Sequence, residues 1–131
     1  MRGEKDGATE TKAQVMERDS AIYLAGLFDG EGCVTYSNPF KLRKGKKKAY
    51  RTWNIRLEIA MTCKRTIQFA FEKFGCGHIN FRPKQSHQTM DQWRWRCSHR
   101  DACKVAKYIA PFSVTKQEKL LEVVNHYVNK K

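Results

Sequence analysis

The sequence has no long apolar segment. None of its hydrophobic runs approaches the ~18 residues that a membrane-spanning helix needs, and its N-terminal residues lack the apolar core of a secretion signal. We therefore expect a chain that stays in a reducing compartment inside the cell and has no membrane partner. In such a compartment all of its cysteines should be free thiols, namely Cys33, Cys63, Cys76, Cys97 and Cys103.

The cysteines and histidines also lack the spacing of a zinc site. Cys76 with His78, and Cys97 with His99 and Cys103, are the nearest approach to one. No Cys-x-x-Cys pair and no His-x3-His pair supports it, so free cysteines in the core or at an edge are the favoured interpretation. Internal repeats are absent, and so are the RNP and Gly-x-x-Gly signatures of common RNA-binding domains.

Acidic residues are scarce for a chain of this length. The sequence holds 13 Asp and Glu against 26 Lys and Arg in 131 residues, so its formal net charge is 26 − 13 = +13. Such an excess favours a polyanionic partner, with nucleic acid as the first candidate. A basic protein with a solvated charged face is the competing interpretation. A membrane surface is disfavoured, because no basic amphipathic helix carries a bulky apolar face.

The first part of the chain is expected to be a polar tail followed by a buried helix. Residues 1–18 are charged and show no apolar periodicity, which predicts a flexible tail. Asp19 or Ser20 can cap a helix whose residues 21–28 are apolar on nearly all sides, and Gly30 and Gly32 end it. Residues 19–131 are then one domain.

Strict alternation marks the strands that follow. Residues 33–37 form a first strand, and residues 50–60 a long second one in which Ile55, Leu57 and Ile59 alternate with Arg56 and Glu58. Helices are expected at 64–74, 100–109 and 115–127, and strands at 78–82 and 92–97. The order α-β-β-α-β-β-α-α predicts an α+β fold with a four-stranded antiparallel sheet covered by helices on one face.

The outward face of that sheet carries Thr, Asn, Gln and Arg, the residue types that contact base edges in a major groove. Outward strand residues are polar in any one-sided sheet, but the many arginines and the adjacent basic loop favour a DNA-binding face. The candidates on the strands are Thr35, Ser37, Thr52, Asn54, Arg56, Glu58, Asn80, Arg82, Gln92, Arg94 and Arg96. The candidates for phosphate contacts in the loop are Arg43, Lys46, Lys47 and Lys48.

The residues that decide between these interpretations run from Leu24 to Gly32, Leu-Ala-Gly-Leu-Phe-Asp-Gly-Glu-Gly. Seven of the nine positions match the LAGLIDADG motif of homing endonucleases, with Glu31 counted as equivalent to the family's more frequent Asp. A buried helix explains the leucines, but it does not explain two acids and three glycines at these spacings. The resemblance continues over about residues 20–128.

The resemblance implies a homodimer with a curved sheet that forms a saddle on double-stranded DNA. A chain with one motif needs a second copy to complete one active site, and the motif helices form the interface in the family. The small residues Ala25 and Gly26 would let the motif helices of two chains approach each other closely. The resemblance therefore implies interface roles for Leu24, Ala25, Gly26, Phe28 and Asp29.

The resemblance also implies the catalytic residues. Glu31 would bind Mg²⁺, with Mn²⁺ as a substitute, and the Gly30 carbonyl would supply a second oxygen ligand. Asp29 is expected to cap or orient rather than to coordinate. Lys116 matches the family's active-site lysine, although a solvated lysine in a helix's first turn is the alternative. The family's polar residue at the end of the second strand falls at Met61 or Thr62, and of these two only Thr62 could position water.

The expected function is site-specific cleavage of a long, near-palindromic DNA site by metal-dependent hydrolysis, in a compartment that contains DNA. The alternative is a non-cleaving protein on the same fold, either an intron RNA maturase or a DNA-binding regulator. The intact Glu31 and Lys116 favour cleavage. RNA is expected as a partner only in the maturase case.

Overall fold

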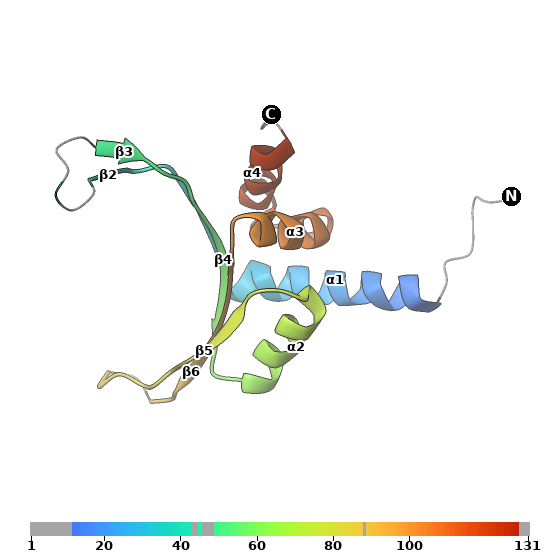
Figure 1. Cartoon of the computed structure of the whole chain (residues 1–131). Helices are drawn as coiled ribbons and strands as arrows, with labels where there is room; N and C mark the ends of the chain where they lie inside the picture. Colours follow the sequence, from blue (N-terminus) through green and yellow to red (C-terminus); the bar gives the residue numbers. More distant parts are fainter. Residues whose placement is uncertain (1–11, 43–44, 46–48, 88, 129–131) are drawn as a thin grey trace, which may run out of the picture.

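A computed structural model describes residues 12–42, 45, 49–87 and 89–128 of the chain. Helices and strands alternate in blocks along the sequence (Figure 1). In chain order the elements are α1 (Lys12–Glu31), β1 (Gly32–Ser37), β2 (Phe40–Leu42), β3 (Ala49–Arg51), β4 (Asn54–Met61), α2 (Lys64–Phe74), β5 (His78–Arg82), β6 (Gln92–Ser98), α3 (Arg100–Ile109), a short 3₁₀ turn (Ala110–Phe112) and α4 (Gln117–Val128).

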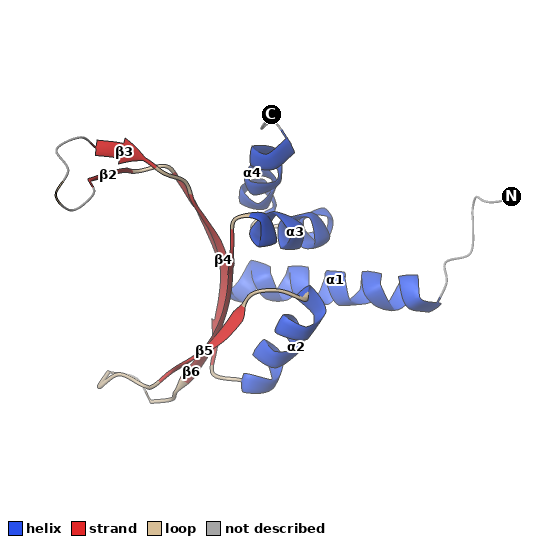
Figure 2. Ribbon diagram, in the orientation of Figure 1, coloured by secondary structure: helices blue, strands red, loops and turns tan. Residues whose placement is uncertain are grey.

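Four of the strands form one antiparallel sheet in the order β1-β4-β6-β5. The sheet is curved, and all four helices lie on one side of it, so that its other face is left uncovered (Figure 2). The predicted α+β class, the antiparallel sheet and the one-sided helical layer are confirmed. No helix within the described ranges is long and apolar enough to cross a membrane.

Apolar side chains of one parity build the core between the sheet and the helices. Across the strands, Ile59 pairs with Trp95, and Trp95 pairs with Ile79. Trp95 and Ile59 are fully buried, as are Leu24 and Phe28 of α1. The predicted inward parity of β4 and β6 is therefore confirmed, and it fixes which face of the sheet stays open.

A glycine lets the chain turn tightly from α2 into β5. Gly77 has φ +92°, and a Cβ there would lie 2.6 Å from Trp95 Nε1 and 2.7 Å from the carbonyl oxygen of Arg96. Trp95 Nε1 donates a hydrogen bond to the carbonyl of Cys76 at 2.9 Å. The turn and the largest core side chain thus fix one another, which sets the position of β6 in the sheet.

The first helix is longer than the sequence suggested. α1 begins at Lys12, so Asp19 and Ser20 lie inside the helix and do not cap it. Residues 12–18, expected as part of a tail without secondary structure, are helical, and residues 1–11 lie outside the described part of the chain. Lys, Ala, Gln, Met, Glu and Arg, the residues that dominate this stretch, are good helix formers, and Tyr108 Oη donates to the carbonyl of Glu17 at 2.9 Å.

The expected long strand over residues 50–60 is interrupted. β3 ends at Arg51 and β4 starts at Asn54, while β2 and β3 pair with each other as a separate two-stranded ribbon. Pro39 lacks an N–H group and lies next to the end of β1, so the ladder cannot continue there. At the base of the ribbon Arg51 donates to the carbonyl of Asn38 at 2.9 Å and covers the ring of Phe40.

Candidate nucleic-acid interface and metal site

The uncovered face of the sheet carries nearly all the polar residues predicted for it. Strand pairing aligns Thr35 with Arg56, Glu58 with Arg96, and Arg94 with Asn80. The ten predicted residues that lie on this open face are Thr35, Ser37, Asn54, Arg56, Glu58, Asn80, Arg82, Gln92, Arg94 and Arg96. They share one parity, opposite to the buried side chains, so the strand geometry brings them onto one surface.

Other predictions for this surface have different outcomes. Thr52 lies between β3 and β4, outside any strand, and is half-buried. Arg43, Lys46, Lys47 and Lys48 fall outside the described residues. The open face also includes residues that the sequence interpretation did not select, namely Cys33, His78 and Ser98. The same alternation could have found them, because each shares the parity of its chosen neighbours.

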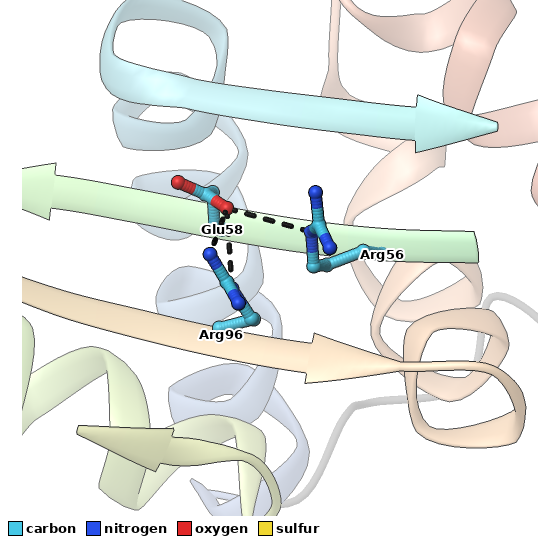
Figure 3. Close-up of polar contacts among 3 residues, drawn as sticks. All are labelled: Arg56, Glu58 and Arg96. Carbon is cyan, nitrogen blue, oxygen red and sulfur yellow. Dashed lines mark hydrogen bonds and ion pairs between the residues drawn. The ribbon is translucent and has the colours of Figure 1, made fainter. Parts of the chain in front are cut away.

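The arginines of the open face crowd one another. Burial lowers the pKa of the Arg94 guanidinium, and the nearby positive charge of Arg96 lowers it further, while Glu58 opposes the shift. Glu58 Oε1 lies between two arginines (Figure 3): Arg96 Nε donates to it at 3.3 Å, and Arg56 Nε lies 3.6 Å away. Among the strand residues described on this face, Glu58 is the single acid.

Asp29, in the last turn of α1, holds the start of the C-terminal helical segment. Its carboxylate accepts hydrogen bonds from Ser113 Oγ, from the amide of Val114 at 2.8 Å and from the amide of Lys116 at 3.1 Å. Burial raises the pKa of Asp29, but these hydrogen bonds outweigh it and hold the pKa below its usual value. Asp29 therefore caps, as the sequence suggested.

Lys116 lies beside the end of the motif helix. Its Nζ donates to the carbonyl of Asp29 at 3.0 Å, one of the last carbonyls of α1 that lack a partner within the helix. The helix α4 begins one residue later, at Gln117, and not at Thr115 as expected. The structure thus brings the predicted lysine to the motif, although the two are far apart in the sequence.

Glu31 is exposed at the last position of α1, and Gly30 is exposed next to it. A carboxylate and backbone carbonyl oxygens at the negative end of a 20-residue helix are suitable ligands for a hard cation. Within the described ranges no group of three or more His, Cys, Asp or Glu side chains could enclose a metal ion. The oxygen ligands at Glu31 and Gly30 therefore fit a divalent cation only if further ligands come from outside this copy of the chain.

A groove opens between β1 and the start of α4. It has a volume of about 600 Å³, and its lining includes Gly32, Cys33, Lys116 and Lys119. Thr62, the other predicted catalytic residue, is exposed in the bend after β4, beyond the Ile59–Gly32 pair. Glu31 and Lys116 thus both lie at the end of α1, whereas Thr62 lies three residues beyond the pair that joins β4 to Gly32, and no hydrogen bond joins it to Glu31 or Lys116.

The predicted dimer-interface residues separate into two groups. Leu24, Ala25 and Phe28 are 0% exposed in the core of their own chain, so they cannot contact a partner. Their interface assignment is wrong. Residues 21–28 are apolar on nearly all sides, so the sequence alone did not show which side of α1 faces the sheet. Gly26 is exposed, and a Cβ there would meet nothing within 4 Å. The uncovered side of α1, which we call the α1 stripe, consists of Ile22, Tyr23, Gly26, Leu27 and Gly30.

Comparison with known proteins gives a consistent result at the level of structure. No family model and no curated protein sequence matches the chain. The homing endonuclease I-CvuI, solved in complex with its target, superposes with a TM-score of 0.66 at 14% identity, over 85% of this chain and 67% of that chain. The chain has the LAGLIDADG homing endonuclease fold.

Two further structures with this fold extend the comparison. The archaeal intron-encoded homing endonuclease I-Vdi141I, complexed with DNA, has a TM-score of 0.63 and 19% identity over 86% of this chain and 71% of that chain. The I-SmaMI LAGLIDADG homing endonuclease bound to cleaved DNA has a TM-score of 0.58 and 15% identity, over 80% of this chain but only 34% of that chain. The present chain thus spans about one third of I-SmaMI.

Proposed function

We propose that this protein is a site-specific double-strand DNA endonuclease that acts as a homodimer and requires Mg²⁺ or Mn²⁺. The observation that carries the proposal is the position of Glu31, an exposed carboxylate next to the edge of an open sheet face that holds four arginines and one acid. A cationic, concave face accommodates a duplex, and the carboxylate next to it can hold a cation against a phosphate.

Binding is attributed to the open face and the ribbon. The arginines and amides of β4, β5 and β6 would contact base edges, because a strand ribbon can enter the major groove. The relatives described above were solved with DNA, and I-CvuI was solved in the presence of Ca or Mg. With its net charge of +13, the chain can also neutralise phosphates along a long site.

Cleavage is attributed to Glu31 and Lys116. Glu31 and the Gly30 carbonyl would hold the cation, which when bound lowers the pKa of water and stabilises charge on the phosphate oxygens. Lys116, fixed by the carbonyl of Asp29, would place a positive charge near the scissile phosphate. Thr62 would orient water through its hydroxyl group.

The dimer is attributed to the α1 stripe. One chain supplies the exposed carboxylate of Glu31 at the end of α1. A second copy packed along α1 would supply another Glu31 across a two-fold axis. Tyr23 and Ile22 are large apolar side chains that are 53% and 46% exposed. Gly26 and Gly30 lack side chains, which would allow the α1 helices of two copies to approach closely.

The function can be tested with a library of duplexes of random sequence. The protein should select one duplex sequence and, with Mg²⁺, cut both strands of it, while a chelator should abolish cutting. Sequencing of the ends maps the product. Selection of a site without any cutting in Mg²⁺ or Mn²⁺ would instead indicate the non-cleaving alternative, and absence of a selected duplex would refute both.

The dimer interface can be tested by Gly26→Leu. Because a side chain at this position meets nothing in its own chain, the variant should keep its fold but move from dimer to monomer on DNA and lose at least about tenfold in affinity. Light scattering and circular dichroism report the two properties. Lys104→Leu, on the exposed side of α3, is the matched control and should remain dimeric. A dimeric Gly26→Leu variant would show that the α1 stripe is not the interface.

A further inference from the structure

One oxygen of Glu58 holds two arginines of the open face. Arg96 approaches Glu58 Oε1 with Nε at 3.3 Å and Nη2 at 3.2 Å, and Arg56 approaches it with Nε at 3.6 Å. Figure 3 shows the two guanidinium groups on either side of this oxygen, one from β4 and one from the adjacent β6. We call this cluster the Arg56–Glu58–Arg96 triad.

The side chains of the triad are partly buried, and their N–H donors are not all used. The side chains are only 38%, 22% and 30% exposed in the order of its name, so they have limited freedom to reorient. A guanidinium has five N–H donors, and Glu58 occupies only one edge of Arg96. Arg56 Nε and, in the next row, Arg94 Nε are buried and make no hydrogen bond, so a partner that arrives at the open face would meet the remaining N–H groups of these guanidinium groups.

We infer that Glu58 is a specificity-determining positioning residue, which holds Arg56 and Arg96 in the orientation that contacts guanines and keeps them from phosphates. The inference rests on the proposed function, because it concerns the same DNA-binding face. An arginine recognises guanine through two parallel hydrogen bonds, which require its fork to be held at a fixed angle.

The negative charge of Glu58 also acts against the wrong partner. A phosphate that approached either arginine would compete with the carboxylate and be repelled by it. A base edge is neutral and can bond to the remaining donors without displacing Glu58. Specificity is a difference between affinities, so weakening contacts to arbitrary DNA raises it as effectively as strengthening contacts to the site. The other arginines of the face, Arg82 and Arg94, lie in adjacent rows, and within the described strands neither has a carboxylate as close as Glu58 is to Arg56 and Arg96, although the charge of Glu58 also acts on Arg94.

The test compares Glu58→Gln with the wild type on two duplexes, the sequence that the wild type selects from a random library and a scrambled version of it. Gln has the same shape but no charge. Binding is measured in Ca²⁺ at two salt concentrations. Glu72→Gln, an exposed acid on α2 away from the sheet, removes the same charge and is the control. Glu58→Asp keeps the charge but shortens the side chain, and thermal unfolding checks that each variant folds.

We expect Glu58→Gln to bind the scrambled duplex roughly tenfold more tightly, with a salt slope steeper by about one for each released arginine, and to lose preference at the guanine positions. Glu58→Asp should bind the scrambled duplex as the wild type does but should lose part of the base preference. The decisive quantity is the ratio of the affinity for the selected duplex to the affinity for the scrambled duplex. The inference alone would be overturned if this ratio were unchanged in both Glu58→Gln and Glu58→Asp. It would also be overturned if Glu72→Gln changed the ratio as much as Glu58→Gln does. A wild type that selects no sequence would overturn the proposed function as well.

Discussion

Replacement of Glu31 by Gln should lower the rate of double-strand cleavage by a factor on the order of 10³ or more, while the affinity for the selected duplex changes less than about threefold. The loss is large because Glu31 is the exposed carboxylate at the end of α1, whereas the carboxylate of Asp29 is occupied by Ser113, Val114 and Lys116. An amide oxygen is a weaker ligand for Mg²⁺ than a carboxylate, and the reaction depends on the charge that the bound cation supplies. Binding survives because it is spread over the open face and the phosphates.

Single-turnover cleavage at saturating protein, together with binding in Ca²⁺, separates these two effects. Glu122→Gln is the control, since this exposed acid lines the groove near Lys116 but lies further along α4. It should cut within about threefold of the wild type. A Glu31→Gln variant that cuts at the wild-type rate would place the metal elsewhere, and one that fails to bind DNA would give Glu31 a structural role.

Replacement of Asp29 by Asn should lower the free energy of unfolding by about 1–2 kcal/mol, because a partly buried set of hydrogen bonds to a charged acceptor is disrupted. One oxygen of Asp29 accepts from Ser113 and Lys116 and the other accepts from Val114, so the NH₂ group of Asn would face an N–H or O–H donor at one of these two positions. The change also loosens the segment that carries Lys116, so cleavage should fall together with stability. Urea unfolding at pH 7 measures the first effect.

The same contacts predict a pH dependence. The hydrogen bonds hold the pKa of Asp29 below its usual value, despite burial that raises it. A lowered pKa in the folded state stabilises the fold above the unfolded-state pKa of about 4, and this contribution is lost as the pH falls through the lower folded-state value. The stability difference between wild type and Asp29→Asn should therefore be constant from pH 7 to about pH 5 and shrink below pH 4. A difference as large at pH 2 as at pH 7 would contradict this role for the charge.

Local patterns in the sequence were sufficient for much of the fold. The helices at 64–74 and 100–109 and the strand at 78–82 begin and end as predicted, because glycines or changes of period mark their limits. The alternation in β4 and β6 assigned every polar residue of these strands to the correct face of the sheet. Successive side chains of a strand point to opposite faces, and the face with the apolar side chains is the buried one.

Features that depend on distant contacts could not be predicted in the same way. Residues 21–28 are apolar almost all round, so their sequence could not show that Leu24 and Phe28 face the chain's own sheet while Ile22 and Tyr23 remain uncovered. The hydrogen bonds of Asp29 cross more than 80 residues of sequence. The separate ribbon was not predicted, because the alternation expected over residues 50–60 gave no sign that β3 ends at Arg51 and pairs with β2.

The alternation of the sheet has an evolutionary consequence. Successive residues of β4 and β6 face opposite environments, so selection for packing acts on Ile55, Leu57 and Trp95 and leaves the intervening positions free of that constraint. Substitutions at those intervening positions should change which partner is recognised at little cost in folding. Related chains should therefore diverge fastest on one parity of these strands and most slowly on the other, which lets the protein acquire new targets while its scaffold is preserved.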